Sequence, residues 1–406
     1  MGFVMRGWIQ LLRTAVLAGA VLGCYPKGWS GMSPMFVTTS DFPFTVGPYV
    51  VLIEQGTIAV VIEHDLDVPP TIEWWHDGSA DEADSSPLTA VGELPTLAEP
   101  RRLEAELLDG LWVATLEGLP LDGGLHYRVR SKIGDTKAIP FKAGVSRGRP
   151  VRFAAFGDTR TGHHIHRALI EALARERVDF VVHSGDLVEF GGVEKLWRQF
   201  FRIESPSIAG RPLFASVGNH DISQRGYFRK YFMTERFAGS DRYFHRDWGD
   251  VRVVILDIEA ELRAGSAQYE FLEERLAEGV RLGMTLVISL HYPPYSSGSH
   301  GSYQELQEVI GEIGPRFGVE LVLAGHDHNY ERSVPIDGVT YIVAASGGAP
   351  IRKISPTRFS AMLRTEPHYV LFDVQHGQLI GRAINLAGDV FDSFVIQQSS
   401  PGPPLP

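Results

Sequence analysis

The sequence predicts an α/β domain that follows a smaller all-β domain. Between residues 48 and 144, short alternating apolar runs are separated by turn residues, with no helix-length segment between them. That pattern is typical of a β-sandwich. From Val151 the pattern of apolar residues changes, and short apolar runs alternate with helix-like segments. This alternation predicts a sheet whose faces are covered by helices.

The composition is that of an ordinary globular protein. The 406 residues are 44% hydrophobic and 21% charged, and the formal net charge is −11. This length allows two domains, each with its own core. Because the net charge is negative, we expect no broad nucleic-acid-binding surface.

The N-terminal residues have the character of an export signal. The first 40 residues contain no Asp or Glu, include Arg6 and Arg13, and then run apolar through "TAVLAGAVLG" to Cys24. A basic start followed by an apolar core of about 10 residues is typical of a secretory signal. Cys24 follows "VLG", which resembles a bacterial lipobox. This implies an exported lipoprotein, held on the periplasmic or extracellular side of a membrane by its N-terminal lipid alone. A lone cysteine in a cleaved signal or in an uncleaved anchor helix is the alternative.

The chain divides into five expected segments. Cys24 is the only cysteine, so no disulfide can form within the chain. After it, no stretch has the roughly 20 uninterrupted apolar residues that a bilayer span requires. The segments are a signal peptide with lipobox (1–24), a tether rich in Gly, Pro and Ser (25–47), the β-sandwich (48–144), the α/β domain (150–396) and a disordered tail (397–406).

The α/β domain has a regular succession of expected elements. Late apolar segments at 340–346, 369–374 and 378–384 have hairpin spacing, which suggests a second sheet. Earlier strands are expected in the segments 151–158, 179–186, 212–221, 251–257, 284–291 and 319–328, each of which closes with a polar residue. Helices are expected at 166–177, 194–203, 267–279 and 303–313.

Polar side chains that can bind metal stand where the apolar runs stop. In open α/β sheets, ligands bind in the crevice outside the carboxyl ends of the strands. Imidazole is the commonest metal ligand among side chains, and here two histidines stand one residue apart. The sequence therefore predicts that five strands deliver polar groups to one site. These groups are Asp158, Asp186, Asn219, His220, His291, His326 and His328.

The motifs that contain these residues resemble those of a known family. "GDTR", "GDLVE", "GNHD", "LHYPPY" and "GHDH" occur, in that order, between residue 151 and about residue 350. They resemble the motifs of calcineurin-like metallophosphoesterases, and "GHDHNYER" is similar to the purple acid phosphatase version. The resemblance implies a metallophosphoesterase β-sheet sandwich flanked by helices, which hydrolyses phosphate monoesters or diesters.

The N-terminal domain fits the same branch of that family. The segment "LEGLPLDGGLHYRVR" around Tyr127 resembles the tyrosine corner of fibronectin type III domains. A fibronectin type III-like sandwich ahead of the catalytic domain occurs in the purple acid phosphatase branch. We therefore expect that fold for residues 48–144.

The resemblance also implies two metal ions. Two cations about 3.5–4 Å apart can activate a water and clamp the oxygens of an in-line displacement. Mixed oxygen and imidazole donors suit iron, zinc or manganese. By resemblance, Asp186 bridges the ions, with Asp158 and His328 on the first metal and with Asn219, His291 and His326 on the second.

Two histidines are candidate catalytic residues by the same resemblance. His220 resembles the family's catalytic histidine, which protonates the leaving alkoxide or orients the phosphoryl group. His300 lies nine residues beyond His291, a spacing similar to that of a second substrate-facing histidine in purple acid phosphatases. The segment around His300, "SSGSHGS", has a simple loop as its alternative interpretation.

The sequence departs from the family at the first metal. Most members have His two residues after the first Asp, whereas purple acid phosphatases have Gly there and a Tyr after the second Asp. This chain has Arg160 and Glu189 instead, so the first site is expected to be weaker or filled differently, without a purple colour. Glu189 could ligate the first metal or orient His220. A guanidinium has no lone pair to donate, so Arg160 is expected to clamp substrate phosphate.

A second hypothesis comes from another class of function. The altered residues around the first metal would also fit a surface binding module, in which the sandwich recognises a glycan or a protein. The catalytic domain would then be degenerate and poorly metallated. Metal content and turnover of a phosphate ester distinguish the two hypotheses.

Overall fold

The structure is a computed structural model that describes residues 42–80, 99–233, 236 and 242–397. The predicted signal peptide, with Cys24, lies outside the described residues, as do residues 25–41 of the predicted tether and 398–406 of the predicted tail. No helix in the described ranges combines the length and the apolar character that a membrane crossing requires.

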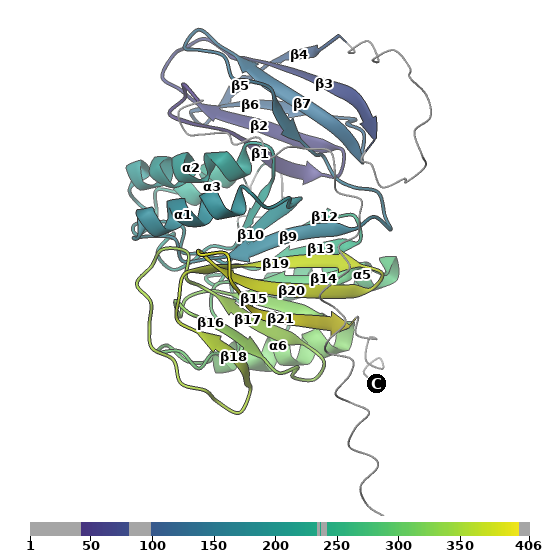
Figure 1. The fold of residues 1–406 in the computed structure, drawn as a ribbon, viewed down its shortest axis with the longest axis vertical. Helices are drawn as coiled ribbons and strands as arrows, with labels where there is room; N and C mark the ends of the chain where they lie inside the picture. The colour runs from purple at the N-terminus through teal and green to yellow at the C-terminus, as the bar shows by residue number, and fades with distance from the viewer. Residues whose placement is uncertain (1–41, 81–98, 234–235, 237–241, 398–406) are drawn as a thin grey trace, which may run out of the picture. The chain divides into compact units, whose positions relative to one another are not determined.

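The N-terminal domain consists of two four-stranded antiparallel sheets (Figure 1). Side chains of both sheets, Val60 and Tyr127 among them, belong to one buried cluster. The predicted all-β domain is confirmed at this level, and its likeness to fibronectin type III stays a prediction. One sheet has the order β1 (Val46–Glu54), β2 (Thr57–Glu63), β6 (Leu111–Leu116), β5 (Glu106–Leu108), and the other β4 (Arg101–Glu104), β3 (Thr71–Ala80), β7 (Gly123–Arg130), β8 (Ile139–Phe141).

The predicted tyrosine corner is wrong. Tyr127 is fully buried, but its hydroxyl donates to the carbonyl oxygen of Ala209 at 2.6 Å. A tyrosine corner bonds instead to the backbone a few residues upstream. Ala209 directly follows a helix of the second domain, so Tyr127 ties the sandwich to that domain. The local sequence could not show which distant carbonyl would meet the hydroxyl.

The second domain contains two mixed sheets. In the first, β9, β10 and β11 are parallel, and in the second, β13, β14, β15 and β17 are parallel. The six-stranded sheet has the order β11 (Leu213–Ala215), β10 (Phe180–His183), β9 (Val151–Phe156), β19 (His368–Gln375), β20 (Gln378–Asn385), β21 (Val390–Gln397). The seven-stranded sheet has the order β12 (Phe244–Trp248), β13 (Val251–Ile255), β14 (Thr285–Ser289), β15 (Leu321–Ala324), β17 (Thr340–Ala344), β16 (Tyr330–Ser333), β18 (Ser360–Arg364).

Helices cover the outer faces of these two sheets. Helices α1 (His163–Leu173) and α2 (Glu194–Ile208) pack on the six-stranded sheet through Leu169 and Ile203. Helices α5 (Ala267–Leu282) and α6 (Gln304–Phe317) pack on the seven-stranded sheet through Leu272 and Ile310. The short helix α3 (Tyr227–Phe232) packs against α2, where the rings of Phe228 and Trp197 lie 6.1 Å apart between centroids (Figure 1). Apolar side chains of the inner faces, such as Phe153, share the central cluster. The predicted β-sheet sandwich flanked by helices is therefore confirmed, whereas one sheet covered by helices on both faces, as the alternation predicted, is wrong because the strand-helix units are divided between two sheets.

The late strands do not form a sheet of their own. Strand β17 pairs with β15, and β19 pairs with β9, so the C-terminal strands extend both sheets. Hairpin spacing predicts that strands consecutive in the sequence pair with each other. The sheet that such a hairpin joins depends on contacts between residues far apart in the chain.

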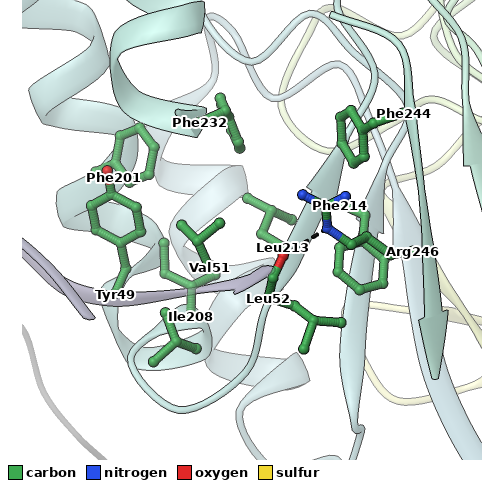
Figure 2. A pocket seen from close by; sticks show the side chains of 11 residues that line it. Tyr49, Val51, Leu52, Phe201, Ile208, Leu213, Phe214, Phe232, Phe244 and Arg246 are labelled. Carbon is green, nitrogen blue, oxygen red and sulfur yellow. Dashed lines mark hydrogen bonds between the residues drawn. The ribbon is translucent and has the colours of Figure 1, made fainter. Parts of the chain in front are cut away.

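A small cavity lies where β1 contacts the second domain (Figure 2). Apolar side chains line most of it, including Tyr49, Phe201 and Phe244. The Nε of Arg246 donates to the carbonyl oxygen of Leu52 at 2.6 Å across this junction. A volume of about 20 Å³ holds roughly one water, far less than the several hundred Å³ of a ligand pocket. The cavity is therefore a packing gap and not a substrate site.

Candidate metal centre

The predicted metal donors follow the carboxyl ends of strands from both sheets of the second domain. Ligand atoms of Asp158, Asp186 and His291 all lie within 4.8 Å of one another. This convergence was predicted from the sequence, and the structure brings these three residues together. The six-stranded sheet contributes Asp158 after β9, Asp186 after β10 and Asn219 after β11, and the seven-stranded sheet contributes His291 after β14 and both His326 and His328 after β15.

Four of these donors have a left-handed backbone. Non-glycine residues seldom adopt a positive φ, and each such residue costs about 1–3 kcal/mol. Backbone strain of this kind concentrates at functional sites, so the clustering independently indicates that the turns are built to aim side chains. The four residues are Asp158 (φ 57°), Asp186 (φ 56°), His326 (φ 74°) and His328 (φ 54°).

Two glycines allow the turns to approach one another closely. A Cβ added at Gly218 would lie 2.2 Å from the backbone nitrogen of Asp186. A Cβ at Gly325 would lie 2.7 Å from Oδ2 of Asp158. No side chain fits at either position, which explains the glycine before Asn219 and before His326.

Two of the donors predicted for the second metal position have buried polar atoms without a hydrogen-bond partner. His291 donates from Nδ1 to the carbonyl oxygen of Ser184 at 2.8 Å, as metal-ligating histidines usually do with their other ring nitrogen. Its Nε2 is buried 3.4 Å from Oδ1 of Asp186 and makes no hydrogen bond within the described residues. The Oδ1 atom of Asn219 is also buried and also makes no hydrogen bond within the described residues. Buried polar atoms are normally paired, so these atoms fit a cation.

His326 is the remaining donor predicted for the second metal position. Its Nε2 lies 3.0 Å from the hydroxyl of Tyr303, which leaves Nδ1 for a metal. Its ring lies 5.1 Å from that of His291, between centroids. Together with Asp186, Asn219 and His291, this residue gives the position mixed oxygen and nitrogen donors.

The electrostatics of the centre favour a bound cation. Burial would lower the pKa of His291, but Asp186 raises it to about 9, so without a metal His291 carries a proton at pH 7, and a metal ion would take the place of that proton beside Asp186. Burial would likewise raise the pKa of Asp186, yet His291 keeps it well below the ordinary value. Burial lowers the pKa of His326 to about 2 and that of His328 to about 4. Metals bind neutral imidazole, and both of these histidines are neutral at pH 7.

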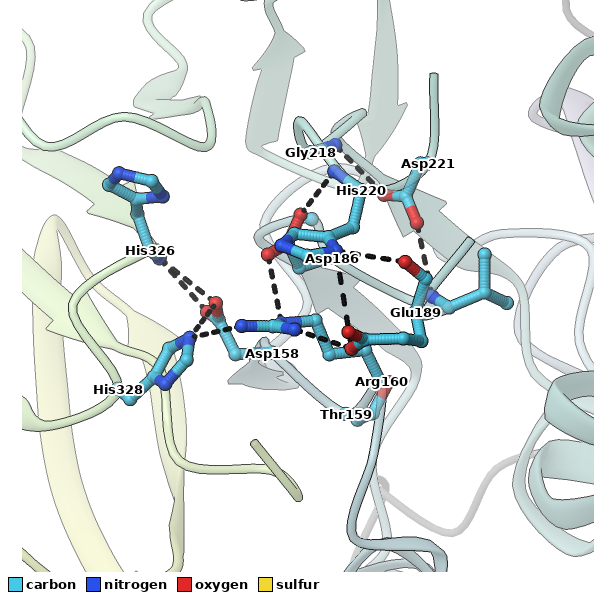
Figure 3. A network of polar contacts seen from close by, with 12 residues as sticks. Asp158, Thr159, Arg160, Asp186, Glu189, Gly218, His220, Asp221, His326 and His328 are labelled. Atoms are coloured by element: carbon cyan, nitrogen blue, oxygen red, sulfur yellow. Dashed lines mark hydrogen bonds and ion pairs between the residues drawn. The ribbon is translucent and has the colours of Figure 1, made fainter. Parts of the chain in front are cut away.

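The first metal position contains the guanidinium of Arg160 (Figure 3). Its Nε lies 3.3 Å from Oδ2 of Asp186, and its Nη2 lies 3.4 Å from Nε2 of His328. Its Nη1 donates to Oε2 of Glu189. Three of the four groups predicted or considered as ligands of the first metal therefore already contact a cation. The fourth group, Asp158, lies 3.4 Å from Nε2 of His328 and accepts the backbone N–H of His326 at 3.0 Å. In this arrangement the residues of the first position do not fit a metal ion.

Glu189 takes neither of the two predicted roles with its carboxylate, which pairs with Arg160. The carboxylate Oε2 is 4.0 Å from Nδ1 of His220, too far for a hydrogen bond. It is the backbone carbonyl of Glu189 that accepts from Nδ1 of His220, at 2.8 Å. Glu189 therefore orients His220 through its main chain.

Both candidate catalytic histidines lie at the centre. The backbone N–H of His220 donates to Oδ1 of Asp186 at 3.0 Å, and its Nδ1 is held by the carbonyl of Glu189, which leaves Nε2 for a substrate. The ring centroid of His300 lies 4.1 Å from that of His326. The backbone N–H of His300 donates to Asp327 at 2.8 Å, so the segment around His300 is bound to the centre.

Two supporting acids were not identified from the sequence. Asp221 is buried and accepts the backbone N–H groups of Gly218, Leu187 and Val188 at 2.8–3.1 Å, and burial raises its pKa to about 8. Asp327 is fully buried and accepts from Ser296 and from the backbone of His300. Their signal in the sequence was an aspartate next to a predicted ligand or catalytic histidine, in "GNHD" and "GHDH".

Comparison with known proteins agrees with the motifs. Residues 151–330 match the family model described as Calcineurin-like phosphoesterase. A protein of Hordeum vulgare described as a nucleotide pyrophosphatase/phosphodiesterase is 26% identical over 277 residues, which cover 57% of this chain and 74% of that protein. Purple acid phosphatase 21 of Arabidopsis thaliana is 28% identical over 220 residues, which cover 49% of this chain and 50% of that protein. This chain thus aligns with about half the length of the Arabidopsis relative.

A solved structure shows the same fold. Purple acid phosphatase PPD1 from yellow lupin (Lupinus luteus) seeds superimposes with a TM-score of 0.71 at 21% sequence identity, covering 86% of this chain and 74% of that chain. The predicted resemblance to calcineurin-like metallophosphoesterases, in the purple acid phosphatase-like branch, is confirmed. The relatives indicate a phosphoric ester hydrolase.

Proposed function

We propose that this chain, whose residues 151–330 match the calcineurin-like phosphoesterases, hydrolyses phosphate esters with a bound metal ion. The observation that carries the proposal is the buried Nε2 of His291, which has no hydrogen-bond partner and lies 3.4 Å from Oδ1 of Asp186. Oδ1 of Asn219 is likewise buried without a hydrogen-bond partner. A metal ion at this position would supply Lewis-acid charge and would lower the pKa of a bound water.

The residues at the second metal position would hold that ion. Asp186 and Asn219 supply oxygen, and His291 and His326 supply nitrogen, a donor set that suits iron, zinc or manganese. The prediction of two ions requires another ion at the first position. That ion could enter only if Arg160 gave up its contacts with Asp186, His328 and Glu189.

Arg160 is suited to bind the phosphate of the substrate. Its guanidinium has five N–H donors, and its contacts with Asp186, Glu189 and His328 leave donors available. A planar fork of donors fits phosphate oxygens. An Arg160→Ala variant with unchanged KM and unchanged turnover would contradict this role.

His220 is the candidate general acid for the leaving alkoxide. The contact between its Nδ1 and the carbonyl of Glu189 fixes the ring, so a proton on Nε2 would point away from that anchor. His300 is the candidate second substrate-facing histidine, and Asp327 fixes the backbone of its segment. A general acid at this point contributes about 10²–10⁴-fold to turnover.

The direct test is metal analysis combined with a chromogenic phosphate-ester assay. Bound metal, and turnover that a chelator abolishes and metal restores, would support the proposal. A panel of monoesters and diesters then identifies the substrate class. Protein that binds no metal and hydrolyses no ester in the panel would instead support the surface binding module, the alternative that the position of Arg160 favours.

We also propose that the chain is exported and anchored through a lipid on Cys24. The basic and apolar N-terminal composition and the lipobox-like "VLG" before the cysteine support this proposal. Labelled fatty acid should be incorporated into the wild-type chain but not into Cys24→Ser. Equal labelling of both would contradict it.

The fibronectin type III-like character of residues 48–144 is a further part of the proposal. The two four-stranded antiparallel sheets with a shared core support it. The domain would act as a spacer or a gate for substrate. Removing it should change access of large substrates more than access of small chromogenic esters, and equal effects on both would contradict the gate.

A further inference from the structure

We propose that the guanidinium of Arg160 takes the place of the first metal ion, so that the chain binds one metal ion, at the second position. The inference rests on the proposed metal-dependent function and specifies its centre. That centre consists of one exchangeable cation and one cation that is part of the chain. It departs from the two-ion arrangement that the resemblance implies.

The contacts of Arg160 are those expected of a substitute for a metal ion. The guanidinium contacts one carboxylate that the resemblance assigns as the bridging ligand, Asp186, and one imidazole that it assigns to the first metal, His328. It also contacts Glu189, which stands near the position of the family's tyrosine. The side chain of Arg160 is only 9% exposed, so these contacts are shielded from solvent.

The charge of the buried centre supports a single ion. Asp158, Asp186 and Glu189 provide three carboxylates around Arg160 and the metal positions. One divalent ion and one guanidinium balance these three charges. The buried carboxylate of Asp327 adds a fourth negative charge, which is balanced by Arg352, whose Nη1 donates to the carbonyl oxygen of His326. Two divalent ions beside the guanidinium would leave an excess of two positive charges, and uncompensated buried charge is strongly unfavourable.

A metal ion could not share the first position with Arg160. A guanidinium has no lone pair to donate and does not lose its proton in proteins, so it cannot become a ligand. It would have to swing out and give up its ion pairs with Asp186 and Glu189. Breaking a buried ion pair by removing one partner is costly, which opposes entry of a second ion.

The substitution has a chemical consequence. A guanidinium can neutralise charge on phosphate oxygens, as a metal does, but it does not activate a water in the way that a metal does. Water activation would therefore depend on the second position alone. Turnover should accordingly reach its maximum at one equivalent of metal.

The test is the metal stoichiometry of the full chain, measured together with the magnetic coupling of the bound ions. Metal-free protein is reconstituted with Mn²⁺, passed through a desalting column and analysed for manganese per chain and by electron paramagnetic resonance. We expect one uncoupled ion in the wild type. In Arg160→His, an imidazole replaces the guanidinium and we expect two ions with a spin-coupled signal, since two ions in one such centre are only about 3.5–4 Å apart.

Two further variants serve as controls. Arg160→Lys keeps a cationic side chain and should bind one ion. Arg263→His introduces the same imidazole at an arginine whose side chain is 75% exposed, and it should also bind one ion.

Each outcome of the test decides the inference. Two coupled ions in the wild type would overturn it and leave the proposed hydrolase intact. No bound ion in the wild type would overturn both. One ion in folded Arg160→His would also overturn it, because the guanidinium would then not be what excludes the first ion. If Arg160→His does not fold, the wild-type stoichiometry decides alone.

Discussion

The first and second metal positions lie side by side and share Asp186, yet the donors at the two positions have different contacts. At the second position, Nε2 of His291 and Oδ1 of Asn219 are buried without hydrogen-bond partners in the described part of the chain. At the first position, Asp186 and His328 contact Arg160. Leaving buried polar atoms unpaired costs about 1–3 kcal/mol each. The unpaired atoms of the second position are groups that can donate electrons to an ion, whereas the unpaired atom of the first position, Nε of Arg160, is an N–H donor that an ion cannot relieve.

The difference teaches how one residue can change a centre whose other donors are in place. Arg160 stands two residues after Asp158, at a point where the chain leaves β9 and enters the centre. Its length lets the guanidinium reach Asp186, Glu189 and His328 together. The predictions below test whether the two positions are as unequal as their contacts indicate.

The largest expected effect is that of His291→Ala, which removes a donor of the second position. Even loss of an outer partner of a ligand typically costs 10–100-fold in metal affinity or activity, so loss of the ligand itself should leave no retained metal and only background turnover. Metal analysis and the ester assay measure both. His164→Ala, at an exposed position of α1, is the matched control and should behave as wild type. Full metal retention by His291→Ala would show that His291 is not a ligand and that the second position is not the metal site.

His220→Ala should lower turnover by about 10²–10⁴-fold without loss of metal. The reason is that His220 contacts Asp186 only through its backbone N–H, which alanine keeps. The loss should be larger for esters with alkyl leaving groups, which need a proton, than for nitrophenyl esters. An equal loss for both kinds of ester would show that His220 is not the general acid.

Asp327→Asn should lower turnover by about 10-fold, because outer partners of a centre typically contribute 10–100-fold. Asp327 accepts from Ser296 and from the backbone of His300, and asparagine replaces one of its two acceptor oxygens by a donor. Hydrogen exchange of residues 296–302 should become faster. Asp389→Asn, at an exposed position, is the control. Unchanged exchange and turnover in Asp327→Asn would show that the segment is held by other contacts.

The smallest expected effect is on the free energy of unfolding and concerns Glu320, a buried carboxyl group for which no ion pair is found among the described residues. Burial raises the pKa of Glu320 from 4.5 to about 8, whereas Asp186, next to His291, has a lowered pKa. Between pH 4.5 and 8, the folded protein keeps a proton on Glu320 that the unfolded chain releases, so stability falls as pH rises, by up to about 1.4 kcal/mol per pH unit.

Glu320→Gln should make this dependence less steep by up to about 1.4 kcal/mol per pH unit and leave the share that comes from Asp221, whose pKa is also raised to about 8. The amide oxygen of glutamine can still accept the backbone N–H of Leu286, as Glu320 does at 2.7 Å. Denaturation at several pH values measures the slope. The exposed Glu305→Gln is the control and should keep the wild-type slope. The same slope in wild type and Glu320→Gln would mean that Glu320 does not cause it.

The sequence allowed prediction of the residues that frame the centre, but not of all their contacts. Asp158 and Asp186 follow neighbouring parallel strands of one sheet, so their proximity follows from the pattern. His291 follows a strand of the other sheet, so its place beside them depends on how the two sheets pack. Tyr127 shows the limit, since its sequence resembled a tyrosine corner but its hydroxyl bonds to Ala209, 82 residues away. Arg160 shows it again, because its predicted role as a phosphate clamp did not anticipate contacts with Asp186 and Glu189.

The sequence by itself determined the α/β class, the order of most strands and helices, and the chemical types of the donors. Each depends on local periodicity or on turn residues close in the chain. Only the tertiary structure decided which sheet the late strands joined and which partner each buried polar atom found. The reason is that burial and ion pairing depend on distances of a few Å between residues far apart in sequence, and those distances exist only after the chain has folded.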